Sequence, residues 1–198
     1  MARLTRKEKQ AHTRNCLMKS AAKVFAKRGL QQASIDEVAE EAGYTKGAFY
    51  ANFKNKEELF LAMLDERFGE KLTEIERVAA GDDFSLAATS DPEFDRLFFE
   101  FSAYAARNED FRQELVTRYR SMRDRIAAAL RARHEELGMG TPLIPFDQVA
   151  LMTCAMANGF ALEKLLEPDA VPDELYGTML TVFFAGLTAL KEAAPAPA

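Results

Sequence analysis

The chain has 198 residues, of which 48% are apolar and 29% charged, and this balance is typical of a folded protein rather than a disordered one. Such a length suits one large domain, or a small and a medium one. Cys16 and Cys154, the only cysteines, match no metal-ligand or redox spacing, which favours reduced thiols in a cytoplasmic protein. No apolar segment follows the basic N-terminus, and no apolar run approaches the roughly 20 residues of a membrane span, so we expect neither a secretory signal nor a membrane segment.

Charge is distributed unevenly along the chain. The net charge is -5, yet residues 1–56 carry 12 basic and five acidic side chains, a net +7, which leaves -12 on the remainder. A basic front attracts a polyanion such as nucleic acid, and an acidic body repels it. A basic run can also be no more than a solvated face, so the charge alone does not decide between these interpretations.

Every apolar series recurs at helical spacing and none alternates as a strand would, so the predicted fold class is all-α. A first helix, with apolar residues at positions 17, 21, 24 and 25, ends near Gly29. A second helix begins at Ser34, which can form a capping box with Glu37. It ends at Gly43, where a left-handed residue can terminate a helix.

Only a short turn separates the second helix from the third. Thr45 is the expected N-cap of a third helix from Lys46 to Phe53, and Asn55 is the expected N-cap of a fourth. Three helices with a tight glycine-containing turn between the second and third are typical of the helix-turn-helix motif.

A longer helical body follows. Its predicted elements are the rest of the fourth helix up to about Gly81, a helix starting at Asp91-Pro92, another after a break near Asn108, a loop over 138–145, and two final helices, Phe146 to Leu166 and Asp173 to Leu190. The last residues, 193–198, are expected to form a disordered tail.

The third helix has the composition of a DNA-reading helix. Phe49 and Phe53 can pack back onto the first two helices, while the rest of its surface is small, hydrogen-bonding and free of acidic side chains. Gly47 would allow the backbone to approach base edges in the major groove. The alternative for Gly47 is a helix defect, and for Tyr50 it is a half-buried aromatic with a solvated hydroxyl.

Residues 14–64 resemble the DNA-binding domain of the TetR family of bacterial transcriptional regulators, through the ordered segments AAKVFAKRG, ASIDEVAEEAG, YTKGAFYANF and KNKEELF. The resemblance implies a cytoplasmic homodimer that binds a palindromic operator in double-stranded DNA, usually as a repressor, and releases it when a small-molecule effector occupies the C-terminal domain. It also implies that Thr45, Lys46 and Gly47 read bases. The residues implied to contact phosphates are Ser34, Tyr44, Tyr50, Asn52 and Lys56.

We therefore expect a helix-turn-helix domain over residues 1–55, with a basic arm over 1–13, and an effector-binding and dimerisation domain over residues 56–192. Small residues recur in the last two helices, about 146–190, and apolar residues surround more of each helix than one core-facing stripe requires. This pattern places the dimer interface there, as in the four-helix bundle of the family. Burial of both helices within one subunit is the alternative.

Aromatic and methionine side chains of the body can line a cavity for a mainly apolar effector. These candidates are Phe98, Phe101, Tyr104, Tyr119, Met122, Met152, Met156 and Phe160. A polar contact could come from Asn158, Arg118 or His134. Phe and Met at helical spacing are also the residues of an ordinary core, so either interpretation stands.

Two other functions remain as alternatives. An enzyme is disfavoured because the sequence contains no nucleophile elbow, no phosphate-binding glycine loop and no metal-ligand cluster, and no cofactor is expected. A constitutive DNA-binding regulator or an activator, whose C-terminal domain only dimerises, would share the same helix-turn-helix. If an effector does act, we expect it to shift the fourth helix and so change the separation of the two third helices in the dimer.

Overall fold

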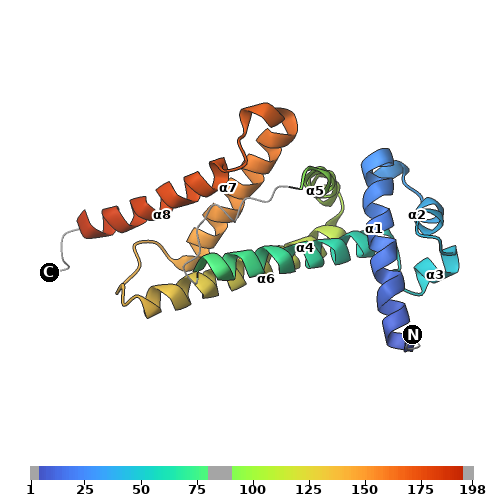
Figure 1. The fold of residues 1–198 in the computed structure, drawn as a ribbon, viewed down its shortest axis with the longest axis horizontal. Helices are drawn as coiled ribbons and strands as arrows, with labels where there is room; N and C mark the ends of the chain where they lie inside the picture. Colours follow the sequence, from blue (N-terminus) through green and yellow to red (C-terminus); the bar gives the residue numbers. More distant parts are fainter. Residues whose placement is uncertain (1–4, 80–90, 194–198) are drawn as a thin grey trace. The chain divides into compact units, whose positions relative to one another are not determined.

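The computed structural model describes residues 5–79 and 91–193, and every regular element in these two ranges is helical, which confirms the all-α fold class (Figure 1). The elements are α1 Arg6–Gln32, α2 Ile35–Glu41, α3 Lys46–Tyr50, α4 Lys56–Ala79, α5 Pro92–Ala105, α6 Glu109–Glu136, α7 Phe146–Leu166, the 3-10 turn η2 Pro168–Ala170, and α8 Leu175–Ala193. Residues 1–4 of the predicted arm, the predicted helix end near Gly81 and residues 194–198 of the predicted tail lie outside the described residues.

The chain forms two compact units. The first contains residues 1–67 and 93–116, and the second contains residues 68–92 and 117–198. The first unit thus combines α1 to α3 with the first half of α4, nearly all of α5 and the start of α6. The predicted boundary near residue 55 separates two functions, and it stays a prediction. The boundaries of the compact units lie at other residues.

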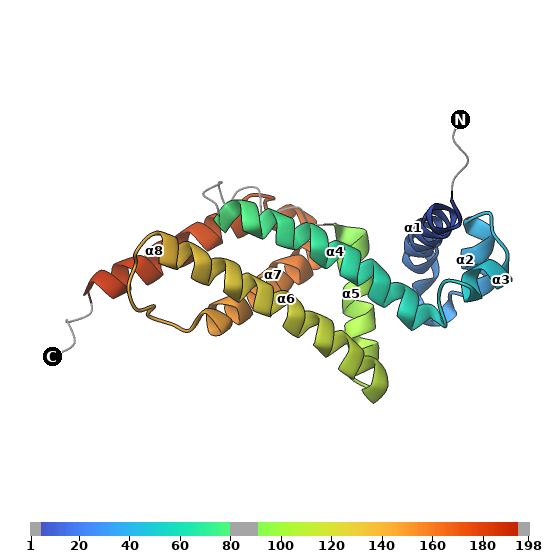
Figure 2. The same ribbon diagram turned by 90° about the horizontal axis from the view of Figure 1, so that it is seen from below.

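Aromatic side chains form the core of the first unit. Phe60 of α4 stacks on Phe101 of α5 with ring centroids 3.5 Å apart, and Phe25 of α1 meets Phe101 edge-on at 5.9 Å. All three rings are at most 1% exposed. Such pairs contribute about 0.5–1.5 kcal/mol each beyond the apolar area they bury. α5 crosses the first part of α4 (Figure 2), and its Phe101 completes the aromatic core of the first unit.

Capping boxes begin the first two helices. Thr5 and Glu8 form one at the start of α1, so the predicted basic arm is helical from Arg6 onward. At the start of α2, the Glu37 N–H donates to Ser34 Oγ at 3.1 Å and the Ser34 N–H donates to Glu37 Oε2 at 3.0 Å, as the sequence predicts. The backbone hydrogen bond from Ser34 lowers the pKa of Glu37, because it favours the ionised carboxylate.

α1 continues past its predicted end. Gly29 has a φ of 74°, and the helix resumes after this kink up to Gln32. The Leu30 N–H, which the kink frees from the helix, donates to Glu100 Oε1 of α5 at 2.6 Å. A Cβ on Gly29 would lie 3.0 Å from the same carboxylate oxygen. The predicted stop near Gly29 therefore coincides with a break between two helices, and a further turn up to Gln32 follows because a side chain from α5 satisfies the backbone at the break.

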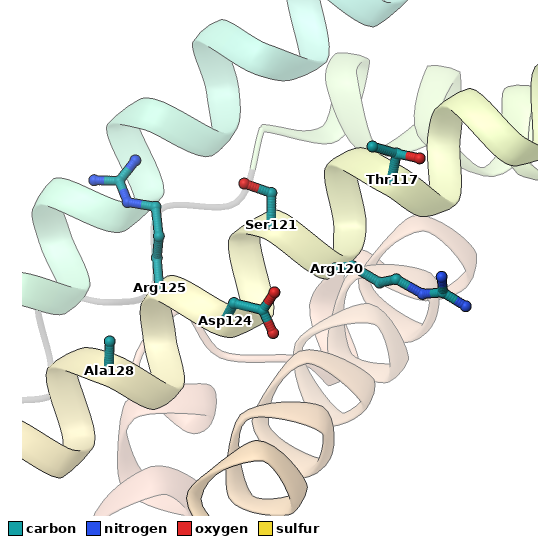
Figure 3. A pocket seen from close by; sticks show the side chains of 6 residues that line it. All are labelled: Thr117, Arg120, Ser121, Asp124, Arg125 and Ala128. Atoms are coloured by element: carbon teal, nitrogen blue, oxygen red, sulfur yellow. The ribbon is translucent and has the colours of Figure 1, made fainter.

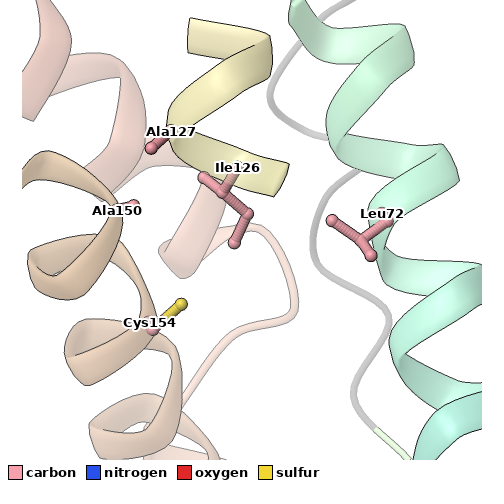
Figure 4. Packing of buried hydrophobic residues seen from close by; sticks show 5 residues of the cluster. All are labelled: Leu72, Ile126, Ala127, Ala150 and Cys154. Carbon is pink, nitrogen blue, oxygen red and sulfur yellow. The ribbon is translucent and has the colours of Figure 1, made fainter. Parts of the chain in front are cut away.

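The core of the second unit joins α4, α6 and α7 (Figure 4). Its buried members are Leu72, Ile126, Ala127, Ala150 and Cys154. Cys154 is buried and Cys16 is half-buried, and both are free cysteines. Burial raises the pKa of the Cys154 thiol to about 11, so this side chain stays protonated at neutral pH and acts as a small apolar group.

Gly29→Ala should lower the free energy of unfolding by about 1–3 kcal/mol, because an L residue is strained at this positive φ and its methyl group would crowd the Glu100 carboxylate. Gly69→Ala is the matched control. An added Cβ at Gly69, within α4, meets nothing within 4 Å. Alanine at this position should therefore raise stability by about 0.5–1 kcal/mol. Urea denaturation followed by circular dichroism measures both variants, and equal effects would contradict the constraint at Gly29.

Candidate DNA-binding interface

The turn between α2 and α3 is defined by backbone hydrogen bonds. Gly43 adopts a φ of 73° and its N–H donates to the Glu40 carbonyl at 2.9 Å, while the Tyr44 N–H donates to the Ala39 carbonyl at 2.8 Å. This is the Schellman arrangement, which satisfies the last carbonyls of α2. Thr45 Oγ1 then accepts the Ala48 N–H at 3.2 Å and caps α3. The predicted glycine stop and the predicted N-cap are both confirmed.

α3 is shorter than predicted. It spans five residues, Lys46–Tyr50, and the chain turns at Ala51 and Asn52 before reaching Phe53. Phe49 and Phe53 are nonetheless each 1% exposed, with ring centroids 5.7 Å apart, so both pack inward as expected. Phe49 and Phe53 are spaced as in a helix although a turn lies between them. The predicted helix end was therefore placed too late.

The outer side of α3 is exposed and carries no acidic side chain. Thr45, Lys46 and Gly47 are exposed at its first turn, and Tyr50 is 52% exposed at its last residue. A Cβ at Gly47 would meet only Thr45 Oγ1, at the ordinary distance of 3.7 Å. No packing within the described chain therefore requires glycine at this position, although a close approach by another molecule would.

Lys46 has an exchangeable partner. Its Nζ lies 2.9 Å from Asp36 Oδ2, and this hydrogen bond raises the pKa of the ammonium. Both side chains are more than half exposed. Ion pairs of this kind contribute little to stability in water, so the lysine can exchange the carboxylate for another acceptor at small cost.

Two of the predicted phosphate contacts face inward. Asn52 Nδ2 donates to the Ala48 carbonyl at 2.8 Å, and its Oδ1 is buried with no hydrogen-bond partner among the residues that the structure describes. Lys56 Nζ donates to the carbonyls of Leu30 and Ala33 at 2.8 and 2.9 Å. By contrast, Ser34 is exposed and Tyr44 is half-buried. The structure thus gathers the other predicted contacts at the surface and engages these two within the unit.

The predicted effector residues fall into both compact units. Phe101 belongs to the aromatic core of the first unit, and the Tyr104 hydroxyl donates to Glu57 Oε1 at 3.1 Å in that same unit. Phe98, also in the first unit, meets Phe99 edge-on. The remaining five residues, which lie in the second unit, are Tyr119, Met122, Met152, Met156 and Phe160.

Within the second unit, Tyr119 is the best connected of these candidates. Its hydroxyl and the Asn158 side chain exchange hydrogen bonds of 3.2 Å, and its ring meets Phe68 edge-on. Met122 packs against the buried cluster, Phe160 meets Tyr176 edge-on, and Met152 is 41% exposed. The set therefore includes core residues and surface residues, and its role in binding an effector stays a prediction.

A hollow of about 480 Å³ lies elsewhere, along one face of α6 (Figure 3). It is lined by Thr117, Arg120, Ser121, Asp124, Arg125 and Ala128. Arg125 also pairs with Glu76 at 3.1 Å. The sequence prediction considered apolar positions and therefore missed this hollow. Its lining residues are mostly polar and recur at helical spacing along α6.

A short exposed helix at the end of a tight helix-helix turn defines a helix-turn-helix DNA-binding protein. The model for bacterial regulatory proteins of the tetR family matches residues 17–63, and the model for the C-terminal part of BetI-type transcriptional repressors matches residues 75–189. The chain therefore belongs to the TetR family of bacterial regulatory proteins. The family consists of regulators rather than enzymes.

Two relatives and one solved structure are similar to the chain over different shares of its length. TtgR of Pseudomonas putida is 43% identical over 65 residues, which cover 33% of this chain and 30% of TtgR. AcrR of Shigella flexneri is 35% identical over 89 residues, which cover 43% of this chain and 41% of AcrR. The matches thus span less than half the length of these two relatives. The structure of Salmonella enterica GusR is similar at a TM-score of 0.69 and 20% identity, over 94% of this chain and 98% of GusR.

Lys56→Met should lower the free energy of unfolding by about 1.5–3 kcal/mol, because hydrogen bonds from a charged donor would be lost at two backbone carbonyls. Lys54→Met is the control, since Lys54 is exposed and surface substitutions usually change stability by no more than about 0.5 kcal/mol. Urea denaturation measures both. A Lys56 variant as stable as the control would show that these carbonyl contacts contribute nothing.

Proposed function

We propose that the protein is a homodimeric repressor that binds a palindromic operator through α3 and releases it when a mainly apolar small molecule binds the C-terminal part of the chain. The observation that carries DNA reading is the exposed, acid-free outer side of α3, with Gly47 at its first turn. Repression is supported by the match of residues 75–189 to the C-terminal part of BetI-type transcriptional repressors. We place this activity in the bacterial cytoplasm, at the nucleoid.

In this proposal α3 enters the major groove. Thr45 and Lys46 would donate to base edges, and Gly47 would let the backbone approach them closely. Ser34, Tyr44 and Tyr50 would contact phosphates on either side. Asn52 and Lys56 would need to leave their internal partners, the carbonyls of Ala48 and Leu30, to do the same.

Dimerisation through α7 and α8 is supported by the apolar surface that these helices expose. Leu166 of α7 is 73% exposed, while Val182 and Leu190 of α8 are 67% and 62% exposed. Only 17% of the most apolar 18-residue window of α7 is buried within the single chain. Large apolar side chains exposed to this degree on two successive helices favour an interaction surface over a solvated one.

α7 is also the one helix in the described ranges that is long and apolar enough to cross a membrane by length and composition. A single helix of this kind is weak evidence for a membrane segment, because helices of soluble proteins have the same properties. The dimer interface explains its surface without a membrane, since a second copy of α7 and α8 would cover the exposed side chains.

Val182→Glu should dissociate the dimer at micromolar concentration, because a carboxylate would be buried without a partner in the apolar interface. Leu137→Glu is the control: Leu137 is 53% exposed but follows α6, outside the proposed interface. Sedimentation velocity distinguishes the two variants. A dimer that tolerates glutamate at position 182 as well as at position 137 would place the interface elsewhere.

Effector control rests on the aromatic and methionine side chains of the middle helices. The half-buried Tyr119–Asn158 pair offers a polar contact in the second unit. Thermal-shift measurements with an apolar and a hydrophilic compound set test the proposed chemistry. Stabilisation by hydrophilic compounds alone would contradict a mainly apolar effector. If no compound stabilises the protein although it binds an operator, the alternative of a constitutive regulator without an effector is favoured.

Selection of bound duplexes from a random DNA pool, at about 150 mM salt to suppress non-specific binding, tests the central proposal. We expect one palindromic sequence to be enriched. Lys46→Ala should then lose about 1–3 kcal/mol of discrimination at one base position of each half-site. Lys27→Ala, which removes an exposed lysine from α1, should leave the preference unchanged. Failure of the folded protein to enrich any sequence would contradict operator recognition.

A further inference from the structure

The DNA-reading helix α3 is too short to be stable by itself. It has five residues, whereas isolated helices in water need about 12–15 to be even marginally stable. Thr45 caps its first turn, but its last turn has no left-handed glycine, since Ala51 follows in the right-handed conformation. The orientation of its C-terminal end must therefore be fixed by contacts from elsewhere in the first unit.

Arg14 of α1 supplies such a contact. Its Nη1 donates to the Asn52 carbonyl at 2.9 Å, and its guanidinium carbon lies 4.1 Å from the centroid of the Phe53 ring. The Asn52 side-chain amide donates in turn to the Ala48 carbonyl at 2.8 Å, inside α3. One guanidinium thus stabilises the turn that ends α3 through a charged hydrogen bond and a cation–π contact, and the hydrogen bonds continue from that turn into the helix.

We propose that Arg14 is a positioning residue for operator recognition: it fixes the C-terminal end of α3 and thereby the angle at which the first turn of α3 meets the bases. The inference rests on the proposed role of α3 in reading DNA. Arginine is required because its planar group donates to a carbonyl and stacks on a ring at the same time. A lysine ammonium at this position could reach the carbonyl, but it would have no plane to lay against Phe53.

A direct phosphate contact by Arg14 would make a different prediction. Removing a phosphate contact weakens binding to every sequence and lowers the salt dependence, because one fewer counterion is released. Removing a positioning contact leaves the phosphate charges matched and damages only the geometry of base reading. Loss of specific affinity without loss of non-specific affinity is therefore the property that separates positioning from contact.

The test compares Arg14→Gln and Arg14→Lys with Arg6→Gln, which removes an exposed arginine from the first turn of the same helix. Dissociation constants are measured for the selected operator and for a scrambled duplex over a series of salt concentrations. For both Arg14 variants we expect operator affinity to fall by about tenfold to a hundredfold, the effect of one impaired base contact. Affinity for the scrambled duplex should stay within about twofold, with an unchanged salt slope.

Three results would overturn the proposal. Equal losses on both duplexes, with the salt slope reduced by about one and with rescue by lysine, would make Arg14 a phosphate contact. Unchanged operator affinity in both variants would mean that Arg14 has no role in recognition. An effect of Arg6→Gln equal to that of Arg14→Gln would assign the loss to the general charge of α1.

Amide hydrogen exchange of the free protein tests whether Arg14 anchors α3, independently of whether the protein binds an operator. Both Arg14 variants should show faster exchange over Ala48 to Phe53, with exchange in α2 unchanged and with the wild-type circular dichroism spectrum retained. Faster exchange, in a protein whose wild type selects no operator, would contradict the proposed function and leave the anchoring of α3 intact. Wild-type exchange rates in both variants would contradict the anchoring itself.

Discussion

The stacking of Phe101 on Phe60 is the contact on which the first unit depends. It joins α5 to α4 at a ring separation of 3.5 Å, and Phe25 of α1 closes the cluster from the edge. Without α5, these rings would face water on one side. The helix-turn-helix is therefore not a free-standing module followed by a body, since its core is completed by residues that come after the whole of α4.

Polar contacts reinforce the same junction at the connection between α1 and α2. Glu100 of α5 accepts the Leu30 N–H, and Lys56 of α4 donates to the carbonyls of Leu30 and Ala33. The Glu100 carboxylate and the Lys56 ammonium thus bind backbone groups between α1 and α2 that have no partner within a helix. Because buried backbone groups without partners are costly, α4 and α5 determine the path of the chain into α2.

The sequence predicted best where the determinant is local. Ser34 and Gly43 delimit α2 through contacts within a few residues, and α7 begins and ends as expected because it follows Pro145 and precedes Pro168. The end of α3 was missed because the spacing of Phe49 and Phe53 imitates one more helical turn. The inward course of Lys56 was missed because its acceptors come from another helix. Helical spacing likewise cannot tell which compact unit an aromatic residue joins.

The first unit is built from two stretches of the chain that are far apart in sequence, and this affects how it folds during synthesis. Domains commonly fold as they leave the ribosome, N-terminal parts first. Here the first unit includes residues 93–116 as well as residues 1–67, so α1 to α3 emerge well before Phe101 can cover their apolar side. Until that point the nascent chain exposes the rings of Phe25 and Phe60. Helix α3 is therefore made early in translation but acquires its complete support only when more than half of the polypeptide exists.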